Sequence, residues 1–257
     1  MAGRVTMRMG ALLGPVADAG QPRFLAEQAR RYEGEGFSSL WMAQAVGRGF
    51  MFPDPLLALA VAATVTNTVE IGTAVLQLPL YPVMDLAHRV FTLQQICGDR
   101  LRLGLGAGST AQDFAAFERS YERRFQTFNT SLAALRDVFV NGNNGRSSLT
   151  PWPSVRGGPP LFFGTWGNGV ERAAREFDGW IASANYRTVD EVVAAAGRVH
   201  AAGGKRAIVS TIQVMPDTDT GELREKLARF RAAGFDDAVV MLHPGAMAAA
   251  DVRKLLT

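Results

Sequence analysis

The segment that most constrains the fold of this chain runs from residue 69 to residue 109. It opens with a short apolar and β-branched run at 69–75, followed by a turn bounded by Pro79 and Pro82 and then by apolar residues at helical spacing. A second apolar run, 101–105, completes the segment. A strand, a helix of about four turns and a second strand within roughly 35 residues form the βαβ unit of a parallel sheet.

The same alternation continues along the rest of the chain. Runs typical of strands occur at 5–13, 37–42, 69–75, 101–105, 161–163, 179–182, 206–214 and 237–242. Each is followed by a segment with helical spacing or helix-end signals, at 22–36, 55–66, 83–96, 114–140, 170–177, 188–202, 221–233 and 246–256. Strands and helices that alternate eight times in about 250 residues predict a (β/α)8 TIM barrel, with an open doubly wound sheet as the alternative. We expect one domain over residues 1–257.

Composition excludes several other classes of protein. The charged fraction of 20% is ordinary, and the net charge of +3 is spread along the chain, which does not favour nucleic-acid binding. No segment approaches the ~20 apolar residues of a membrane span, and the N-terminus lacks a secretory leader. We therefore expect a cytoplasmic protein without nucleic-acid or membrane partners. The single cysteine, Cys97, excludes an intrachain disulfide and a thiolate cluster, and we expect no metal site.

Residues 141–160 are rich in glycine, asparagine, serine and proline, which is typical of an irregular loop. We interpret this segment as a trimmed loop insertion and not as a linker between domains. Short insertions at the mouth of the barrel would leave an active site open, or complete only with a partner.

Several motifs follow one another in the segment 69–109. They are a strand ending in Gly72-Thr73-Ala74, the Leu-Pro-Leu turn at 78–80, a leucine-centred helix, Gly98-Asp99-Arg100 and the LGLGAG strand at 103–108. In this order they resemble the core of the luciferase-like flavin- and F420-dependent oxidoreductases. The resemblance covers most of the chain and is strongest at 22–140 and 160–183. It implies the same barrel, a flavin-type cofactor, a small-molecule substrate and a homodimer.

In such a barrel the reactive site lies at the C-terminal ends of the strands. After the third predicted strand come Thr73, Ala74 and Val75. The resemblance implies a non-prolyl cis peptide here, matching the Ala74–Val75 bond, which forms a bulge behind the flavin ring. An ordinary strand end is the alternative interpretation.

The fourth predicted strand ends in Gly106, Ala107, Gly108 and Ser109. The spacing is superficially that of a Rossmann fingerprint, but the glycines lie inside and just beyond a strand, so we reject that fold. Small residues at this place allow a flat ring to approach the backbone, as in the family. The alternative is that they only ease packing within the barrel.

The loop after the fifth predicted strand contains Thr165, Trp166, Gly167, Asn168, Gly169 and Val170, and a helix follows it. Backbone amides of a glycine-rich turn at a helix N-terminus can bind phosphate without a lysine. The resemblance implies that this loop holds the cofactor phosphate, with residues 167–170 as donors. A tight, well-capped turn is the alternative.

Two positions depart from the family pattern. Ala45 stands where members often carry a histidine above the flavin, and Ser109 where F420-dependent dehydrogenases often carry a glutamate. Gln44, a candidate catalytic residue, can orient a carbonyl but does not transfer a proton at neutral pH. His243, which follows the eighth predicted strand, is the other candidate, with a purely structural role equally open. The departures disfavour dehydrogenation of an alcohol or a sugar.

Three arginines, Arg119, Arg123 and Arg124, lie close together in the fourth predicted helix. They form either a solvated face paired with Glu118 and Glu122 at helical spacing, or a contact for the acidic tail of F420. With the basic net charge they favour F420 and hydride transfer. An FMN-dependent monooxygenase and a non-catalytic flavin-binding paralogue remain alternatives, and the aromatic face of the same helix is a candidate dimer surface.

Overall fold

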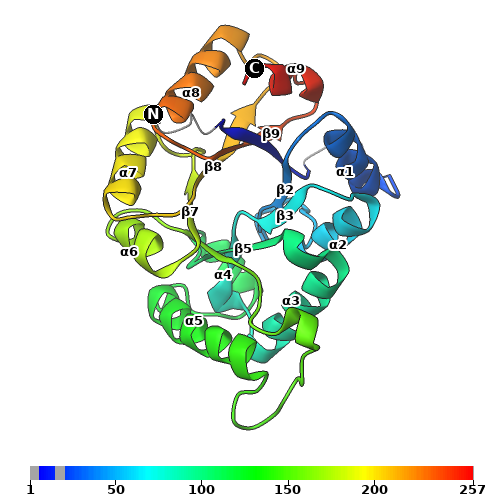
Figure 1. Ribbon diagram of the computed structural model, residues 1–257, viewed down its shortest axis with the longest axis vertical. Coiled ribbons are helices and arrows are strands. Elements are labelled where there is room, and N and C mark those ends of the chain that lie inside the picture. The colour runs from blue at the N-terminus through cyan, green and yellow to red at the C-terminus, as the bar shows by residue number, and fades with distance from the viewer. Residues whose placement is uncertain (1–5, 15–20, 257) are drawn as a thin grey trace.

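The computed structural model describes residues 6–14 and 21–256 and shows a closed parallel barrel surrounded by helices (Figure 1). Its strands are β1 Arg8–Leu12, β2 Ser39–Met42, β3 Glu70–Thr73, β4 Leu76–Gln77, β5 Leu101–Gly106, β6 Leu161–Gly164, β7 Gly179–Ser183, β8 Ala207–Val214 and β9 Asp237–Leu242. Their order is β3-β2-β1-β9-β8-β7-β6-β5-β4, and a further pairing of β3 with β5 closes the ring. The predicted (β/α)8 barrel is confirmed.

The helices cover the outside of the barrel in chain order (Figure 1). They are α1 Phe24–Gly34, α2 Pro55–Val65, α3 Val83–Cys97, α4 Ala111–Ala116, α5 Arg124–Asn141, α6 Gly169–Glu176, α7 Val189–Ala201, α8 Thr220–Ala232 and α9 Ala249–Lys254. Among the described residues, none of them is long and apolar enough to cross a membrane.

Local sequence explains where several helices begin. The Asp54 carboxylate accepts the backbone N–H groups of Leu56 and Leu57, and Pro55 occupies the first turn of α2. Thr188 and Glu191 form a reciprocal capping box at the start of α7. These caps satisfy donors that a helix leaves unpaired at its N-terminus.

One position in the barrel is shared by two short strands. β3 pairs with β2 and β5, and β4 pairs with β5 farther along, so the two occupy the place of a single strand. The peptide bond between them, Ala74–Val75, is cis. The cis bond is confirmed at the position that the resemblance implies.

Glycines beside this interruption make room for it. A Cβ atom added to Gly104 would lie 2.0 Å from the Thr73 carbonyl oxygen. Cβ atoms added to Gly106 and Gly164 would lie 2.7 Å and 2.6 Å from methyl groups of Val75. Glycine at these three positions of β5 and β6 is therefore required by packing around Thr73 and Val75.

The core has two parts. A small cluster fills the barrel interior and consists of Leu12, Trp41, Ala74, Phe162, Ile181, Ile208 and Val239. A much larger cluster lies between the strands and the helices and includes the aromatic face of α5. Phe128 of α5 stacks on Phe163 with ring centroids 4.9 Å apart, and Phe139 contacts Phe91 at 5.4 Å. These rings of α5 are thus core, whereas Phe125 of the same helix is 60% exposed, and a dimer surface there stays a prediction.

A network of charges closes the N-terminal end of the barrel. Arg206 pairs with Asp237 at 2.7 Å and with Glu70 at 2.5 Å. Arg8 and Arg102 reach the same two carboxylates from neighbouring strands. Burial raises the pKa of Asp237, whereas for Glu70 the three arginines outweigh burial and lower the pKa.

The predicted helix 114–140 is in fact two helices. α4 ends at Ala116, Glu118 adopts a left-handed conformation with φ 54°, and α5 begins only at Arg124. No glycine or proline marks the break, and the aromatic spacing persists because Phe114 packs against Tyr121 across it, with centroids 5.4 Å apart. Glu118 and Glu122 therefore do not pair with the neighbouring arginines at helical spacing, and that prediction was wrong.

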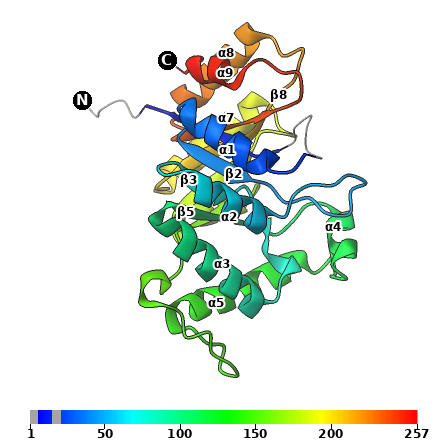
Figure 2. The same cartoon turned by 90° about the vertical axis from the view of Figure 1, so that its right-hand side faces the viewer.

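The segment 141–160 lies at the other end of the barrel from the mouth. It connects the end of α5 to the start of β6, and parallel strands begin at the N-terminal end of the barrel (Figure 2). Apart from a 3-10 turn at Pro153–Val155 and a bridge between Asn143 and Ser148, it is irregular as predicted. Its interpretation as a trimmed mouth insertion was wrong. Val5, the first residue of the first predicted strand, lies outside the described residues.

Candidate functional site

The barrel brings the sequence-predicted site residues to one end. Gln44, residues 73–75, residues 106–109, residues 165–170 and His243 follow or end β2, β3, β5, β6 and β9. Because all strands of the barrel are parallel, these ends meet at a single mouth, the end from which α4 projects in Figure 2. Chemistry at this mouth depends on which polar groups remain free there.

The loop from Thr165 to Val170 forms a tight turn into α6. The Gly169 amide donates to the Trp166 carbonyl at 3.2 Å, and the Val170 amide donates to the Gly167 carbonyl at 3.4 Å. In the described part of the chain, the amides of Gly167 and Asn168 have no acceptor, and the Asn168 side chain does not cap the helix. Two of the four predicted phosphate donors are therefore free, and two are used by the turn.

Surrounding side chains fix this loop. The Trp180 indole N–H donates to the Thr165 carbonyl at 2.9 Å, and its ring meets that of Trp166 edge to face. Arg198 donates to the Gly167 carbonyl at 2.8 Å and pairs with Glu171. The loop is thus held in one conformation by its neighbours before any ligand arrives, which lowers the entropic cost of binding.

The loop fits a phosphate group. Two free amides, the N-terminus of α6 and the Arg187 guanidinium, 5.1 Å from the centre of the Trp166 ring, all supply positive potential. Gly167 has φ 60° and open space beside it, since an added Cβ would meet no heavy atom within 4 Å. Among the described residues, no group of three acidic, histidine or cysteine side chains could hold a metal ion.

A second feature of the mouth is a buried polar network that the sequence did not reveal. The Gln44 amide nitrogen donates to the Tyr81 hydroxyl at 2.6 Å, and the Gln44 oxygen accepts the Gln77 backbone N–H at 2.7 Å. The Gln77 side chain donates to Asp113, which also accepts from Arg48. Both the nitrogen and the oxygen of the Gln44 side-chain amide are thus hydrogen-bonded within the protein. Gln44 supports the mouth and does not offer a free amide to a substrate.

Asp113 is the charged centre of this network. Its side chain is fully buried, and it accepts from Arg48 Nε at 2.7 Å and from the Val46 amide at 3.1 Å. Burial alone would raise its pKa, but the hydrogen bonds from Arg48, Gln77 and Val46 outweigh it and lower the pKa. Burial raises the pKa of Tyr81 to about 12, so its hydroxyl stays protonated at neutral pH.

His243 lies at the mouth in a chain of three polar side chains. Its Nε2 atom hydrogen-bonds the Gln213 side-chain oxygen, and the Gln213 amide nitrogen donates to the Asn185 oxygen at 2.8 Å. Since that oxygen can only accept, Nε2 carries the proton, and Nδ1 of the neutral ring is left as an acceptor. His88 and His200 are exposed on α3 and α7, away from the mouth. Gln213 and Asn185 were missed, although both stand at strand ends.

The two positions that depart from the family pattern also lie at the mouth. Ser109 is exposed, and its carbonyl accepts the Tyr121 hydroxyl at 3.1 Å, while Ala45 is half-buried. Neither side chain can exchange a proton at neutral pH. Of the candidate catalytic residues predicted from the sequence, His243 alone offers a titratable group.

Known proteins are similar to this chain in sequence and in fold. The family model described as luciferase-like monooxygenase matches residues 7–257. The chain is 28% identical over 190 residues to 5,10-methylenetetrahydromethanopterin reductase of Methanolobus tindarius, covering 71% of this chain and 56% of the relative. It is 32% identical over 110 residues to 4-hydroxyprotoasukamycin monooxygenase of Streptomyces nodosus subsp. asukaensis, covering 40% and 30%. The chain thus spans only about a third to a half of the length of these relatives.

A solved structure shares the whole fold. The coenzyme F420 dependent tetrahydromethanopterin reductase of Methanopyrus kandleri superposes with a TM-score of 0.69, covering 98% of this chain and 97% of that one, at 12% identity. At this identity the similarity shows the fold alone.

Proposed function

Because the chain belongs to the luciferase-like monooxygenase family, we propose that it binds a flavin-type cofactor at the barrel mouth and oxidises or reduces a small organic molecule. The observation that carries the proposal is the loop 165–170, where the amides of Gly167 and Asn168 have no acceptor among the described residues and the backbone is held by Trp180 and Arg198. Such a loop binds a phosphate ester, a group that both F420 and FMN carry.

Between the two cofactors we propose F420, with FMN and monooxygenase chemistry as the alternative. The reductase relative matches over 190 residues and the monooxygenase relative over 110, and the chain carries a net charge of +3. F420 supplies a hydride when it is bound. No glutamate at position 109 or histidine at position 45 is present to deprotonate an alcohol, so the substrate we propose has an activated double bond.

The residues of the chain then have separate roles. The amides of Gly167 and Asn168 hold the phosphate, and Thr73, Ala74 and Val75 support one face of the ring. Gln213 and Asn185 orient His243 by hydrogen bonds, and its free Nδ1 can exchange a proton with the substrate. The network around Asp113 keeps the rim of the mouth in place.

Replacing Asn168 by aspartate tests the phosphate loop. The added carboxylate would lie beside the anionic phosphate, so we expect the affinity for the cofactor to fall at least about tenfold, or 1.4 kcal/mol. Residue 168 is exposed and its side chain caps nothing, so folding should be preserved. Fluorescence titration of the apoprotein with F420 and with FMN measures both affinities.

The matched control is Asn168→Ser, which removes the amide without adding charge and should change the affinity less than about twofold. Tighter binding of F420 than of FMN supports the proposed cofactor, and the reverse order supports the monooxygenase alternative. A folded protein that binds neither cofactor would support the non-catalytic alternative. If Asn168→Asp and wild type bind the cofactor with equal affinity, the loop 165–170 is not the phosphate site.

We further propose that the chain forms a homodimer through the outer face of α2 and α3. Leu57, Val61 and Ile96 expose 71%, 38% and 43% of their surfaces there, beside a hollow of about 260 Å³. Adjacent exposed apolar side chains on two helices are typical of an interface between subunits. Leu57→Glu should convert the dimer to a monomer in light scattering, whereas Val140→Glu, at a position on α5 that is 60% exposed, should not. A monomeric wild type would refute the proposal.

A further inference from the structure

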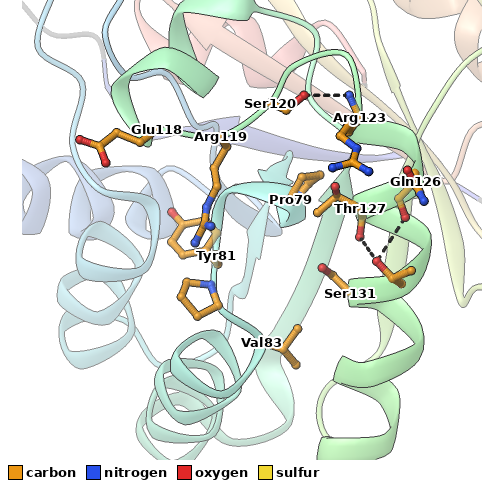
Figure 3. A pocket seen from close by; sticks show the side chains of 12 residues that line it. Pro79, Tyr81, Val83, Glu118, Arg119, Ser120, Arg123, Gln126, Thr127 and Ser131 are labelled. Carbon is orange, nitrogen blue, oxygen red and sulfur yellow. Dashed lines mark hydrogen bonds between the residues drawn. The ribbon is translucent and has the colours of Figure 1, made fainter.

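A cleft of about 590 Å³ lies outside the barrel mouth, between the N-terminal ends of α3 and α5 (Figure 3). One wall is apolar and consists of Pro79, Pro82 and Val83, with the Tyr81 ring beside them. The opposite wall comes from the connection between α4 and α5 and from the first turns of α5. That second wall carries the charge.

Two arginines of this wall point into the cleft. Figure 3 shows the guanidinium groups of Arg119 and Arg123 turned toward the space above Tyr81 and Pro79, while Glu118 points away. Within the described ranges neither arginine forms an ion pair, and the nearby Glu122 carboxylate accepts the Ser120 hydroxyl. The hydroxyls of Thr127 and Ser131 face the same space. Two positive charges and several donors therefore share one concave surface, and Glu118, the one carboxylate among the described lining residues, forms no ion pair with either arginine.

The third arginine of the cluster has a different role. Arg124 lies over the rings of Tyr121 and Phe125, at 3.9 Å and 4.3 Å, and donates to the Tyr121 carbonyl. It fixes the turn that follows Glu118, at the point where the predicted long helix is broken. Arg119 and Arg123 belong to the connection created by this break, between the end of α4 and the start of α5, and both line the cleft.

We propose that this cleft is a binding site for a small organic anion, a carboxylate or a phosphate ester with an apolar body. The anionic group would lie between Arg119 and Arg123, because guanidinium groups bind carboxylate and phosphate through paired hydrogen bonds. The apolar body would cover Pro79, Pro82 and Val83. One wall of the cleft thus carries charged and hydroxyl side chains and the other is apolar, which matches a ligand with an anionic end and an apolar body.

The site is separate from the phosphate loop but adjoins the mouth. Its floor, Tyr81, accepts a hydrogen bond from Gln44, which in turn accepts the Gln77 amide at the end of β4. No residue of the cleft belongs to the loop 165–170. The proposal therefore does not depend on flavin binding and is testable on the apoprotein.

Calorimetric titration of the apoprotein with phenyl phosphate, inorganic phosphate, benzoate and benzyl alcohol tests the site. We expect phenyl phosphate or benzoate to bind at least tenfold more tightly than benzyl alcohol, which lacks the charge. Whichever of phenyl phosphate and benzoate binds more tightly identifies the preferred anionic group, phosphate or carboxylate. Phenyl phosphate should also bind more tightly than inorganic phosphate, because only the ester covers the apolar wall.

Two double variants assign the binding to the cleft. Arg119→Gln with Arg123→Gln should weaken anion binding at least tenfold. Arg146→Gln with Arg156→Gln removes the same charge from exposed positions of the 141–160 loop and should leave binding unchanged. A Thr127→Trp variant, which fills the cleft and keeps both arginines, should also lose binding. The proposal is overturned if the wild-type protein binds none of the anions at concentrations up to about 10 mM, where weak non-specific binding begins. It is also overturned if both double variants lose affinity equally.

Discussion

Arg206→Met should lower the free energy of unfolding by about 3 kcal/mol at pH 7. The guanidinium joins Asp237, whose side chain is fully buried, to Glu70, and a methionine of similar length leaves both carboxylates without this partner. We expect the lower end of the range for broken buried pairs, because Arg8 and Arg102 still contact the two acids. Urea denaturation followed by circular dichroism measures the loss.

The pH dependence of this loss separates charge from packing. Without Arg206, the pKa values of Glu70 and Asp237 should both rise, so the variant regains stability as these acids are protonated. The deficit should therefore be larger at pH 7 than at pH 4. Arg229→Met, which breaks an exposed pair with Asp190, should cost less than about 1 kcal/mol at either pH. A deficit for Arg206→Met that does not change with pH would show that lost packing, and not the ion pairs, is responsible.

Asp113→Asn should also destabilise the protein by about 3 kcal/mol, since it removes a buried charge that accepts from Arg48, Gln77 and the Val46 amide. Asparagine keeps the shape of the side chain but replaces one carboxylate oxygen by an NH2 group. That donor would face one of the N–H donors that now bind Asp113. We expect faster amide hydrogen exchange in residues 44–51 as well, because Val46 and Arg48 anchor that loop to Asp113. Denaturation and exchange followed by mass spectrometry measure the two effects.

Acid should abolish the difference between this variant and wild type. The pKa of Asp113 lies below its usual value, so its contribution is complete above the unfolded pKa, near 4, and is lost as the pH falls through the lower native pKa. Asp217→Asn, at an exposed turn, should change stability by less than about 0.5 kcal/mol throughout. If Asp113→Asn unfolds at the same denaturant concentration as wild type at pH 7, the network does not support the mouth.

Local sequence patterns predicted the barrel because its strands and helices are regular and short. Alternating apolar runs, the Asp54 cap and the glycines at strand ends each act over a few residues, so the chain order of the elements could be inferred. The break after α4 could not, since Glu118 takes a positive φ without a glycine and the aromatic spacing suits one helix as well as two.

Only the part of the candidate site that is formed by consecutive residues of one loop could be predicted from the sequence. The glycines of residues 167–169 mark their own turn, but Gln77 and Asp113 lie 36 positions apart and meet only when the barrel closes. The chain from His243 through Gln213 to Asn185 likewise joins three strand ends. Such pairings depend on register around the barrel, which a single sequence does not specify. The same holds for the ion pairs of Arg206 with Glu70 and Asp237.

Hydrogen exchange of the amides in residues 165–171, with and without saturating F420 or FMN, tests the central claim most directly. If the loop binds the cofactor phosphate, the amides of Gly167 and Asn168, which have no acceptor in the described chain, should become protected when the cofactor binds. Residues 141–160, at the opposite end of the barrel, should exchange as before. Saturating cofactor that leaves residues 165–171 unprotected would contradict the proposed site.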